Sequence, residues 1–266
     1  MQQLTQKLSN GEMSVQEMPS PLVSKGMILV QNHFSLISAG TEGSTAQTAR
    51  KSLLGKAKER PQQVKQLLEV LAQQGPLQTY RAVTKKLEAY SPLGYSSAGI
   101  VLEVGAGVTE FHKGDKVACA GVGYANHAEL VAVPANLCVK LREDADLLNA
   151  SYNTLGAIAL QGIRQADLRL GESCAIIGLG LLGQLAGLML KASGIRVVGI
   201  DVSESPVKMA DKHFADLALM RNTPGIEIQI EEFTKGLGVD AVIIAAATSS
   251  LDPINFAGSI ARKKGS

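Results

Sequence analysis

The fold of this chain is decided by one stretch, which reads SCAIIGLGLLGQLAGLMLKASGIRVVGID from Ser173 to Asp201. An apolar run over 174–177 predicts a buried strand, and the apolar pattern over 182–192 predicts a helix directly after it. A second apolar run over 196–200 predicts another buried strand. Strand–helix–strand units of this kind build parallel sheets with helices packed on their faces. The stretch therefore predicts an α/β fold with a doubly wound parallel sheet.

The turn between the first strand and the helix has the spacing Gly-x-Gly-x-x-Gly, with Gly178, Gly180 and Gly183. The first glycine permits a tight turn, the second lets the backbone approach a pyrophosphate, and the third lets helix and strand pack closely. The start of the helix also offers free N–H groups and the positive end of its dipole. We therefore expect the three glycines, with Leu181 and Leu182, to bind a dinucleotide cofactor.

One acidic residue stands where a ribose would lie. Asp201 ends the second predicted strand, one helix and one strand after Gly183. A carboxylate there can accept hydrogen bonds from both hydroxyls of an adenine ribose, whereas a 2′-phosphate would meet like charge. We therefore predict NAD as the cofactor in preference to NADP. Ala246 and Thr248, at the end of the strand predicted over 239–247, are further candidate cofactor residues.

Two other interpretations of this stretch are weaker. A glycine-rich turn that binds nothing would leave the strand, the helix and the acid in these positions without a reason. A membrane-spanning helix needs about 20 apolar residues, and the apolar run from Cys174 to Leu190 is shorter and contains Gln184. The dinucleotide site is the interpretation that accounts for every part.

Composition limits the classes of function. The 266 residues are 45% hydrophobic with a formal net charge of +2, which favours large cores and gives no sign of a nucleic-acid or membrane partner. The polar start has no signal-peptide core, and Cys119, Cys138 and Cys174 form no C-x-x-C pair. We interpret the cysteines as buried small residues and expect a cytoplasmic protein. The four histidines show no metal-ligand spacing and are interpreted as structural or solvated.

The first half of the chain has short strand patterns separated by glycine-rich turns, which predict a mostly antiparallel β domain over 1–149. Its strands are predicted at 27–37, 100–104, 115–120 and 128–133. A segment at about 45–90 interrupts the domain with two helical patterns, and its lysines and arginines far outnumber its acids. We interpret this charge as a solvated helix face. A rim that attracts an anionic sugar derivative is the sharper alternative.

From about residue 150 the pattern alternates between helices and strands, which predicts a dinucleotide-binding domain over 150–266. Beyond the opening stretch, helices are predicted at 154–166, 205–214, 226–236 and 251–263, and strands at 217–220 and 239–247. These are fewer parallel strands than the roughly six of a complete dinucleotide-binding sheet. We therefore expect further strands beyond Ser266, and a hydrophobic sheet edge that invites aggregation or a partner.

Three motifs of the first half are specific: GIVLEVGAG at 99–107, FHKGDKV at 111–117 and GYANHAE at 123–129. Together with the helix around 156–161, they resemble the medium-chain dehydrogenase/reductase family, whose alcohol dehydrogenases commonly carry zinc. The resemblance implies a GroES-like β domain followed by a Rossmann domain. It also implies an oxidoreductase that transfers hydride between NAD and an alcohol or carbonyl substrate. The basic residue that the family often has five positions after the ribose acid is Pro206 here.

The zinc ligands of that family have no counterpart in this sequence. The family's Cys-Gly-Thr/Ser-Asp motif corresponds to Ala39-Gly-Thr-Glu42, and its Gly-His-Glu motif corresponds to Gly94-Tyr-Ser96. The third ligand would fall at 151–154, where neither a cysteine nor an acid stands. No cysteine precedes Cys119, so the structural zinc lobe is also missing. Because a zinc site needs three or four N, S or carboxylate ligands, we predict no zinc and no other metal.

Without a metal, the expected reaction needs another proton donor or acceptor. Thr41 stands at the family's hydroxyl relay position, and Tyr95 places a phenol where the family has a metal-binding imidazole. Glu42 is expected to orient one of the two. An ordinary packed aromatic is the alternative for Tyr95, so the sequence leaves open which residue carries the proton.

The motif SAGTE at 38–42 and the basic segment narrow the resemblance to the amino-terminal module of bacterial bi-domain oxidoreductases. That resemblance implies a second dehydrogenase domain after Ser266 and a sugar or nucleotide-sugar as substrate. Family members are often dimers or tetramers, but the strand usually used for pairing is absent, so a homo-oligomer stays an open question. The alternatives are an enone or quinone reductase of the same family and a non-catalytic NAD-binding or interaction module.

Overall fold

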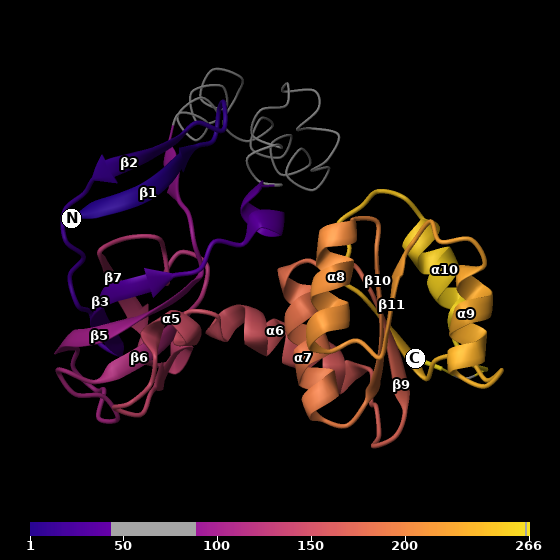
Figure 1. The fold of residues 1–266 in the computed structure, drawn as a ribbon. Helices are drawn as coiled ribbons and strands as arrows, with labels where there is room; N and C mark the ends of the chain where they lie inside the picture. The colour runs from indigo at the N-terminus through magenta and orange to yellow at the C-terminus, as the bar shows by residue number, and fades with distance from the viewer. Residues whose placement is uncertain (44–88, 264) are drawn as a thin grey trace, which may run out of the picture. The chain divides into compact units, whose positions relative to one another are not determined.

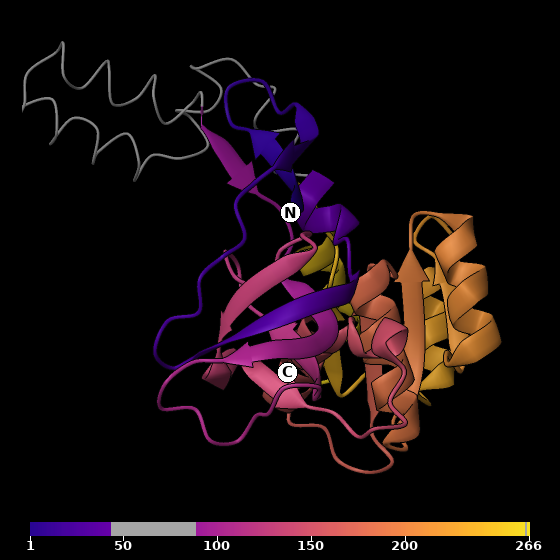
Figure 2. The same ribbon diagram turned by 90° about the vertical axis from the view of Figure 1, so that its left-hand side faces the viewer.

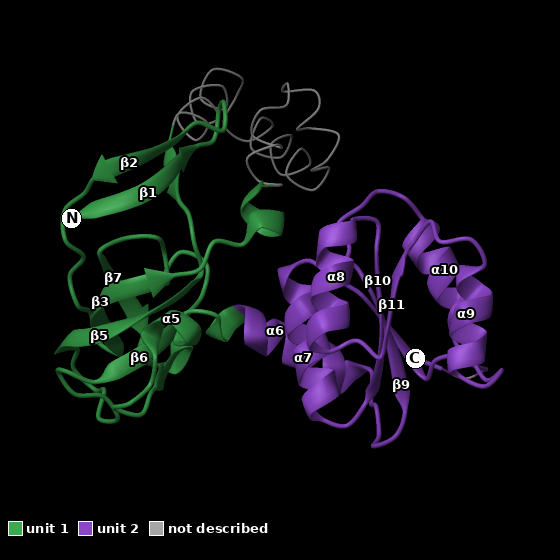
Figure 3. Ribbon diagram, viewed as in Figure 1, with its two compact units in different colours: residues 1–154 green, residues 155–266 purple. Residues whose placement is uncertain are grey.

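The computed structural model describes residues 1–43, 89–263 and 265–266 of the chain. These residues form two compact units, Met1–Thr154 and Leu155–Ser266, which Figure 3 shows in different colours. The sequence pattern places the domain boundary after position 149, and the structure divides the chain a few residues later, after Thr154. The first unit has one hydrophobic core and the second has two, and each unit is described by itself.

The first unit is built from antiparallel strands (Figure 1). Its strands are β1 (Gln2–Lys7), β2 (Met13–Glu17), β3 (Met27–Ser35), β4 (Tyr90–Pro92), β5 (Ser96–Val104), β6 (Lys116–Ala120), β7 (Leu130–Pro134) and β8 (Cys138–Lys140). They pair in two sheets, one in the order β7-β3-β5-β6-β8 and one in the order β2-β1-β4. The described part of the unit also contains η1 (Ala135–Leu137), α5 (Leu147–Ala150) and a helical turn at 39–43. The helices predicted within 45–90 lie outside the described residues, and Tyr90, at the end of that segment, begins β4.

The core of the first unit explains why its larger sheet forms. Ile28 and Val30 alternate along β3, and both side chains are completely buried with Val101, Val117 and Val133 of the neighbouring strands. The four strands that the sequence predicts in this half are confirmed as β3, β5, β6 and β7. The remaining strands, β1, β2, β4 and β8, are not predicted by the pattern.

The second unit is a parallel sheet covered by helices on both faces (Figures 1 and 2). Its strands are β9 (Ser173–Ile177), β10 (Arg196–Asp201), β11 (Leu217–Met220) and β12 (Ala241–Ile244). Its helices are α6 (Asn153–Gln165), which begins at the unit boundary, α7 (Leu181–Ala192), α8 (Glu204–His213), α9 (Ile226–Phe233) and α10 (Asp252–Ile260). The strand order is β11-β10-β9-β12, which confirms the predicted doubly wound α/β fold. No helix in the described part of the chain is long and apolar enough to cross a bilayer.

Strand β9 lies between two separate cores, which is why its sequence is continuously apolar. Cys174 and Ile176 pack in the core that α7 and α8 cover. Ala175 and Ile177 face the opposite way and pack in the core that α9 and α10 cover. All the residues of β9 are buried. The same two layers hold the carboxyl ends of β9 and β10 side by side, where the glycine turn begins.

Strand β12 ends the sheet on one side and is shorter than the strand predicted over 239–247. The final residue of the chain pairs with its outer side. The backbone N–H of Ser266 donates to the carbonyl oxygen of Asp240 at 3.0 Å, and that of Val242 donates to the carbonyl oxygen of Ser266 at 2.9 Å. The predicted hydrophobic edge is therefore paired in part along β12.

Candidate functional site

The glycine turn after β9 has the backbone geometry that a dinucleotide site requires. Gly178 has φ +98°, in the left-handed region that glycine adopts without strain. A Cβ on Gly178 would lie 2.6 Å from the backbone nitrogen of Ala246, so the two segments approach backbone to backbone. A Cβ on Gly183 would overlap the carbonyl oxygen of Gly178, so α7 packs directly on the turn. At Gly180, by contrast, a Cβ would meet nothing within 4 Å, which leaves room for a ligand.

The amino-terminal end of α7 offers donors beside this open space. The helix begins at Leu181, and its cap residue Gly180 has no side chain that could accept from the first N–H groups. Those groups have no acceptor within the helix. Leu182 is partly buried against the core, which fixes this end of the helix. The backbone N–H groups of Leu181 and Leu182 can therefore donate to a pyrophosphate.

Asp201 lies at the end of β10 and is bonded to the same turn. Its Oδ2 accepts a hydrogen bond from the backbone N–H of Leu179 at 2.7 Å, and its Oδ1 accepts one from Ser203 at 2.8 Å. The side chain is half-buried. Because each carboxylate oxygen can accept more than one hydrogen bond, Asp201 can still accept from ribose hydroxyls. The residues present thus fit a dinucleotide, with donors for phosphates, room at Gly180 and an acceptor for the ribose.

The two remaining cofactor candidates lie after β12. The backbone N–H of Ala245 donates to the carbonyl oxygen of Ile177 at 2.8 Å, which holds the exposed Ala246 against Gly178. Thr248 lies in the exposed loop that follows, where its Oγ1 accepts from the N–H of Ser250 at 3.1 Å. Ala246 therefore lies against the glycine turn, and cofactor contacts at Ala246 and Thr248 stay predictions.

The predicted proton-transfer residues lie in the first unit. Thr41 and Glu42 belong to a helical turn at 39–43, and Tyr95 directly precedes β5. The side chain of Thr41 is exposed, and its Oγ1 accepts a hydrogen bond from Oγ of Ser38 at 3.3 Å. Tyr95 is half-buried. Both hydroxyl-bearing side chains are thus held on ordered segments of the unit.

Glu42 makes a contact that the sequence does not predict. Its side chain is 9% exposed, and a carboxylate oxygen lies 3.2 Å from Nε2 of His127. The other oxygen accepts a hydrogen bond from the backbone N–H of Ser38 at 3.1 Å. Nδ1 of His127 lies 2.8 Å from Oγ of Ser35, at the end of β3. His127 is therefore a buried link between β3 and the turn that carries Thr41, and sequence reasoning missed it.

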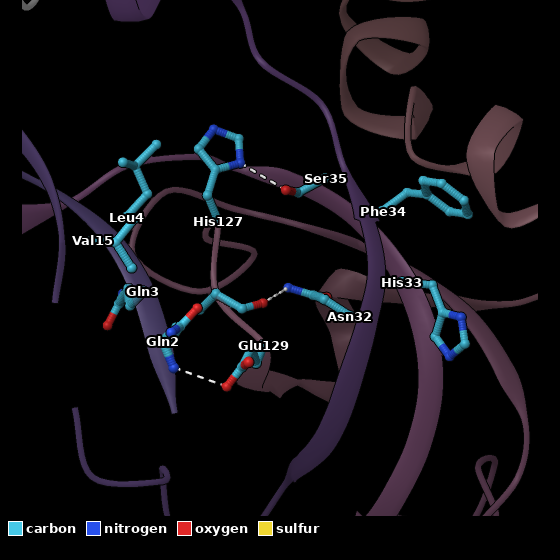
Figure 4. Close-up of a pocket in the computed structure, with 11 residues that line it drawn as sticks. Gln2, Gln3, Leu4, Val15, Asn32, His33, Phe34, Ser35, His127 and Glu129 are labelled. Carbon is cyan, nitrogen blue, oxygen red and sulfur yellow. Dashed lines mark hydrogen bonds between the residues drawn. The ribbon is translucent and has the colours of Figure 1, made fainter. Parts of the chain in front are cut away.

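A cavity of about 330 Å³ lies beside this link (Figure 4). Its walls come from β1, β3 and the segment before β7, and they include Gln2, Asn32 and His127. Figure 4 shows Ser35 and His127 bonded at one end of it, while His33 and Phe34 lie on the other side of β3. Ser35 and His127 thus line one end of the cavity.

The positions that match the family's zinc ligands do not form a zinc site. Ala39 has no ligand atom, and Tyr95 offers only a phenol. Near the third position, the carbonyl oxygen of Ser151 accepts from Oγ of Ser96 at 2.6 Å, and the amide of Asn153 donates to backbone carbonyls. These groups hold the fold together. Within residues 1–43, 89–263 and 265–266, no group of three or more His, Cys, Asp or Glu could hold a metal ion.

Comparison with known proteins identifies the first unit. Residues 70–143 match the family model described as the alcohol dehydrogenase GroES-like domain. A D-guloside 3-dehydrogenase of Escherichia coli (strain K12) is 31% identical over 155 residues, which are 57% of this chain and 43% of that protein. A NAD-dependent alcohol dehydrogenase of Sulfurisphaera tokodaii is 29% identical over 180 residues, 57% of this chain and 52% of that protein. The chain spans about half the length of the curated relatives that it matches.

Solved structures share the fold of the whole chain. An alcohol dehydrogenase from Thermus sp. ATN1 matches 100% of this chain and 75% of its own, with a TM-score of 0.76 at 18% identity. An Escherichia coli quinone oxidoreductase, solved in complex with NADPH, matches 100% of this chain and 71% of its own, with a TM-score of 0.73 at 17% identity. Residues 70–143 thus match the GroES-like domain of alcohol dehydrogenases, and the fold of the chain is that of the medium-chain dehydrogenase/reductase structures.

Proposed function

We propose that this chain is the core of a zinc-independent, NAD-dependent oxidoreductase that acts on an alcohol or carbonyl group. The observation that carries the proposal is the turn at Gly178, Gly180 and Gly183 beside the carboxylate of Asp201. The turn combines a close backbone approach, open space at Gly180 and free helix N–H groups. Its curated relatives include dehydrogenases and reductases, which supports the reaction class.

The charges around Asp201 favour NAD over NADP. A 2′-phosphate would lie beside this carboxylate and needs a basic partner. The residues directly after Asp201, up to Pro206, include no lysine or arginine. The backbone N–H of Arg221 donates to the carbonyl oxygen of Asp201. Its guanidinium group donates two hydrogen bonds to the carboxylate of Asp252, at 2.7 and 3.0 Å. NADP would therefore meet a carboxylate and find the neighbouring guanidinium already paired.

The bound cofactor would supply or accept hydride. A residue of the chain must donate the accompanying proton to the substrate oxygen or accept it from there. Thr41 and Tyr95 are the residues that we propose hold or move that proton, because each carries a hydroxyl at a position where zinc members have active-site groups. A positioned acid or base of this kind contributes about 10²- to 10⁴-fold to a rate. The zinc-independent reaction is supported by the residues that replace the zinc ligands, above all Ala39 and Tyr95.

A sugar or a sugar derivative is the substrate class that we propose. The curated relatives include a D-guloside 3-dehydrogenase and D-xylulose reductases, which supports a polyhydroxylated substrate. An enone or quinone reductase is the second candidate. It is favoured by the missing zinc ligands, because a chain without that Lewis acid lacks what zinc members use on an alcohol. The three free cysteines support a reducing compartment such as the cytoplasm.

A substrate panel with the 266-residue chain tests the proposal. We expect NAD⁺ reduction with xylitol or methyl D-guloside, NADH oxidation with D-xylulose, and unchanged rates after treatment with a strong zinc chelator. Thr41→Val and Tyr95→Phe should each be compared with the unaltered chain, and at least one should lose about 10²-fold or more in kcat. NADH oxidation by an enone or a quinone alone would favour the second candidate. Cofactor binding without turnover of any member would leave a non-catalytic NAD-binding module, which is the third interpretation.

A further inference from the structure

Glu42 and His127 form a buried pair beside the turn that carries Thr41, and His127 has no part in the function proposed above. We propose that His127 is a positioning residue that fixes the Thr41 hydroxyl by acting through Glu42. The inference rests on the proposed function, because that function gives Thr41 its part in proton transfer. It assigns to His127 a role that neither the zinc-ligand positions nor the spacing of the histidines suggests.

The turn at 39–43 is closed on itself by bonds of Glu42 and Ser38. The backbone N–H of Glu42 donates to the carbonyl oxygen of Ser38 at 2.8 Å, and the backbone N–H of Ser38 donates to Oε1 of Glu42 at 3.1 Å. Oγ of Ser38 then donates to Oγ1 of Thr41 at 3.3 Å. The carboxylate of Glu42 therefore helps to hold the turn and the Ser38 side chain that donates to the Thr41 hydroxyl.

A carboxylate as buried as that of Glu42 is stable only when donors surround it. The backbone of Ser38 supplies one donor, and Nε2 of His127 supplies another at 3.2 Å from Oε2. The ring nitrogens of His127 are both engaged, one by Glu42 and one by Oγ of Ser35. A proton on Nε2 suits every arrangement, because Ser35 can either donate to Nδ1 or accept from it. With the proton on Nε2, His127 donates an N–H to the carboxylate of Glu42.

Backbone hydrogen bonds fix the position of His127, so its ring can hold the carboxylate of Glu42 in place. Its backbone N–H donates to the carbonyl oxygen of Leu93, and its own carbonyl oxygen accepts from the N–H of Leu4, both at 2.8 Å. The ring packs on Gly94, which has φ +95°. A Cβ there would lie 2.7 Å from the nitrogen of His127 and 2.9 Å from its Cγ. The site is therefore shaped for an imidazole, and Gly94 is the residue that leaves room for it.

Three variants and one control test the proposal on the 266-residue chain. His127→Gln and Glu42→Gln break the link at its two ends, and Ser35→Ala removes only the partner of Nδ1. His33→Gln is the control, because it lies on the same strand as Ser35 and its side chain is exposed. With NADH and D-xylulose, we expect kcat to fall about 10-fold or more in His127→Gln and Glu42→Gln, with KM for D-xylulose changed less than about threefold. Ser35→Ala should lose less in the same direction.

A double variant at Thr41 and His127 distinguishes a positioning role of His127 from a general loss of structure. In the Thr41→Val background, His127→Gln should cause no further loss of kcat, because the hydroxyl that it positions is gone. The proposal would be overturned if the loss of kcat in the double variant equalled the product of the losses in Thr41→Val and His127→Gln. An unchanged kcat in both His127→Gln and Glu42→Gln would also overturn it. The NADH dissociation constant should stay within about twofold in every variant, because the glycine turn is built from other residues.

Hydrogen exchange of the 35–43 peptide gives a readout that needs no substrate. His127→Gln and Glu42→Gln should speed exchange of the Ser38 and Glu42 amides by about 10-fold or more, while His33→Gln leaves them unchanged. Unchanged exchange in both variants would overturn the proposal even if no substrate is turned over. Faster exchange together with an inactive unaltered chain would instead refute the proposed function and keep the anchoring role. If His127→Gln does not fold, Glu42→Gln and Ser35→Ala decide by the same two readouts.

Discussion

The carboxylate of Asp201 accepts a hydrogen bond from the backbone N–H of Leu179 at 2.7 Å. This bond ties the end of β10 to the middle of the glycine turn that follows β9. One side chain thus holds the turn in shape and presents the acceptor that a ribose would meet. The same carboxylate also accepts from Ser203, so the start of α8 is fixed by it as well.

Asp201→Asn should therefore weaken both cofactor binding and the turn. Asparagine keeps one oxygen acceptor, but its NH₂ group cannot accept from a backbone N–H. Hydrogen bonds to a charged group are worth about 1.5–3 kcal/mol, so we expect the NADH dissociation constant to rise about 10-fold or more, with a smaller change for NADPH. Calorimetric titration measures both. Asp211→Asn, on the exposed side of α8, is the matched control and should leave both constants unchanged.

Two helical glycines should respond in opposite directions to alanine. A Cβ on Gly187 of α7 would overlap the ring of Phe214, whereas a Cβ on Gly162 of α6 would meet nothing within 4 Å. Gly187→Ala should lower the free energy of unfolding by about 1–3 kcal/mol through overpacking. Gly162→Ala should raise it by about 0.5–1 kcal/mol, because alanine favours the helix. Urea denaturation measures both, and equal effects of the two changes would contradict the packing described for α7.

Asp216 should make the stability of the second unit depend on pH. Burial works to raise the pKa of this carboxyl, but Lys191 and the backbone N–H of Val197 more than offset it, so the pKa is lowered. The stabilisation is therefore complete above the unfolded pKa of about 3.8 and is lost as the pH falls through the folded pKa. Asp216→Asn should unfold more easily than the unaltered chain near pH 6, and the gap should close towards pH 2. A gap that stays constant would contradict this pairing.

Cys174 should be chemically inert in the folded chain. Burial raises the pKa of its thiol to about 12, and its side chain is completely buried in β9. The pKa of Cys119 is also raised, first by its hydrogen bond with Cys138 and then by burial. Because only the thiolate reacts, iodoacetamide near pH 8 should label Cys138 before the other two. Peptide mass spectrometry reads the order, and fast labelling of Cys174 under native conditions would show that β9 is not buried as described.

Local sequence patterns predict the second unit well because its strands and helices alternate along the chain, so that neighbouring elements are close in sequence. The glycine spacing, the apolar runs of β9 and β10 and the acid at 201 are all read within one stretch, and the structure confirms the strands and helix there. Strand β11, at Leu217–Met220, has the predicted bounds. Strands β1 and β2 escape prediction because most residues of β1 are polar and the apolar Met13 and Val15 of β2 are exposed, so neither strand has a clear apolar face.

The contact between Glu42 and His127 escapes prediction for a different reason. Glu42 and His127 are 85 positions apart, and their contact depends on how β3 and the segment before β7 come together in the fold. No spacing rule relates two residues at that distance. The glycine at position 94 is the only local signal, and its meaning becomes clear only when the imidazole is seen to pack on it.

Titration of the 266-residue chain with NADH and with NADPH is the most direct test of the dinucleotide site. The turn at Gly178–Gly183 and the carboxylate of Asp201 predict that NADH binds and that NADPH binds at least about 10-fold more weakly. Gly180→Val, which fills the open space beside the helix N-terminus, should abolish binding without unfolding the chain. Equal affinity for the two cofactors would contradict the role given to Asp201. No binding of either would contradict the site itself.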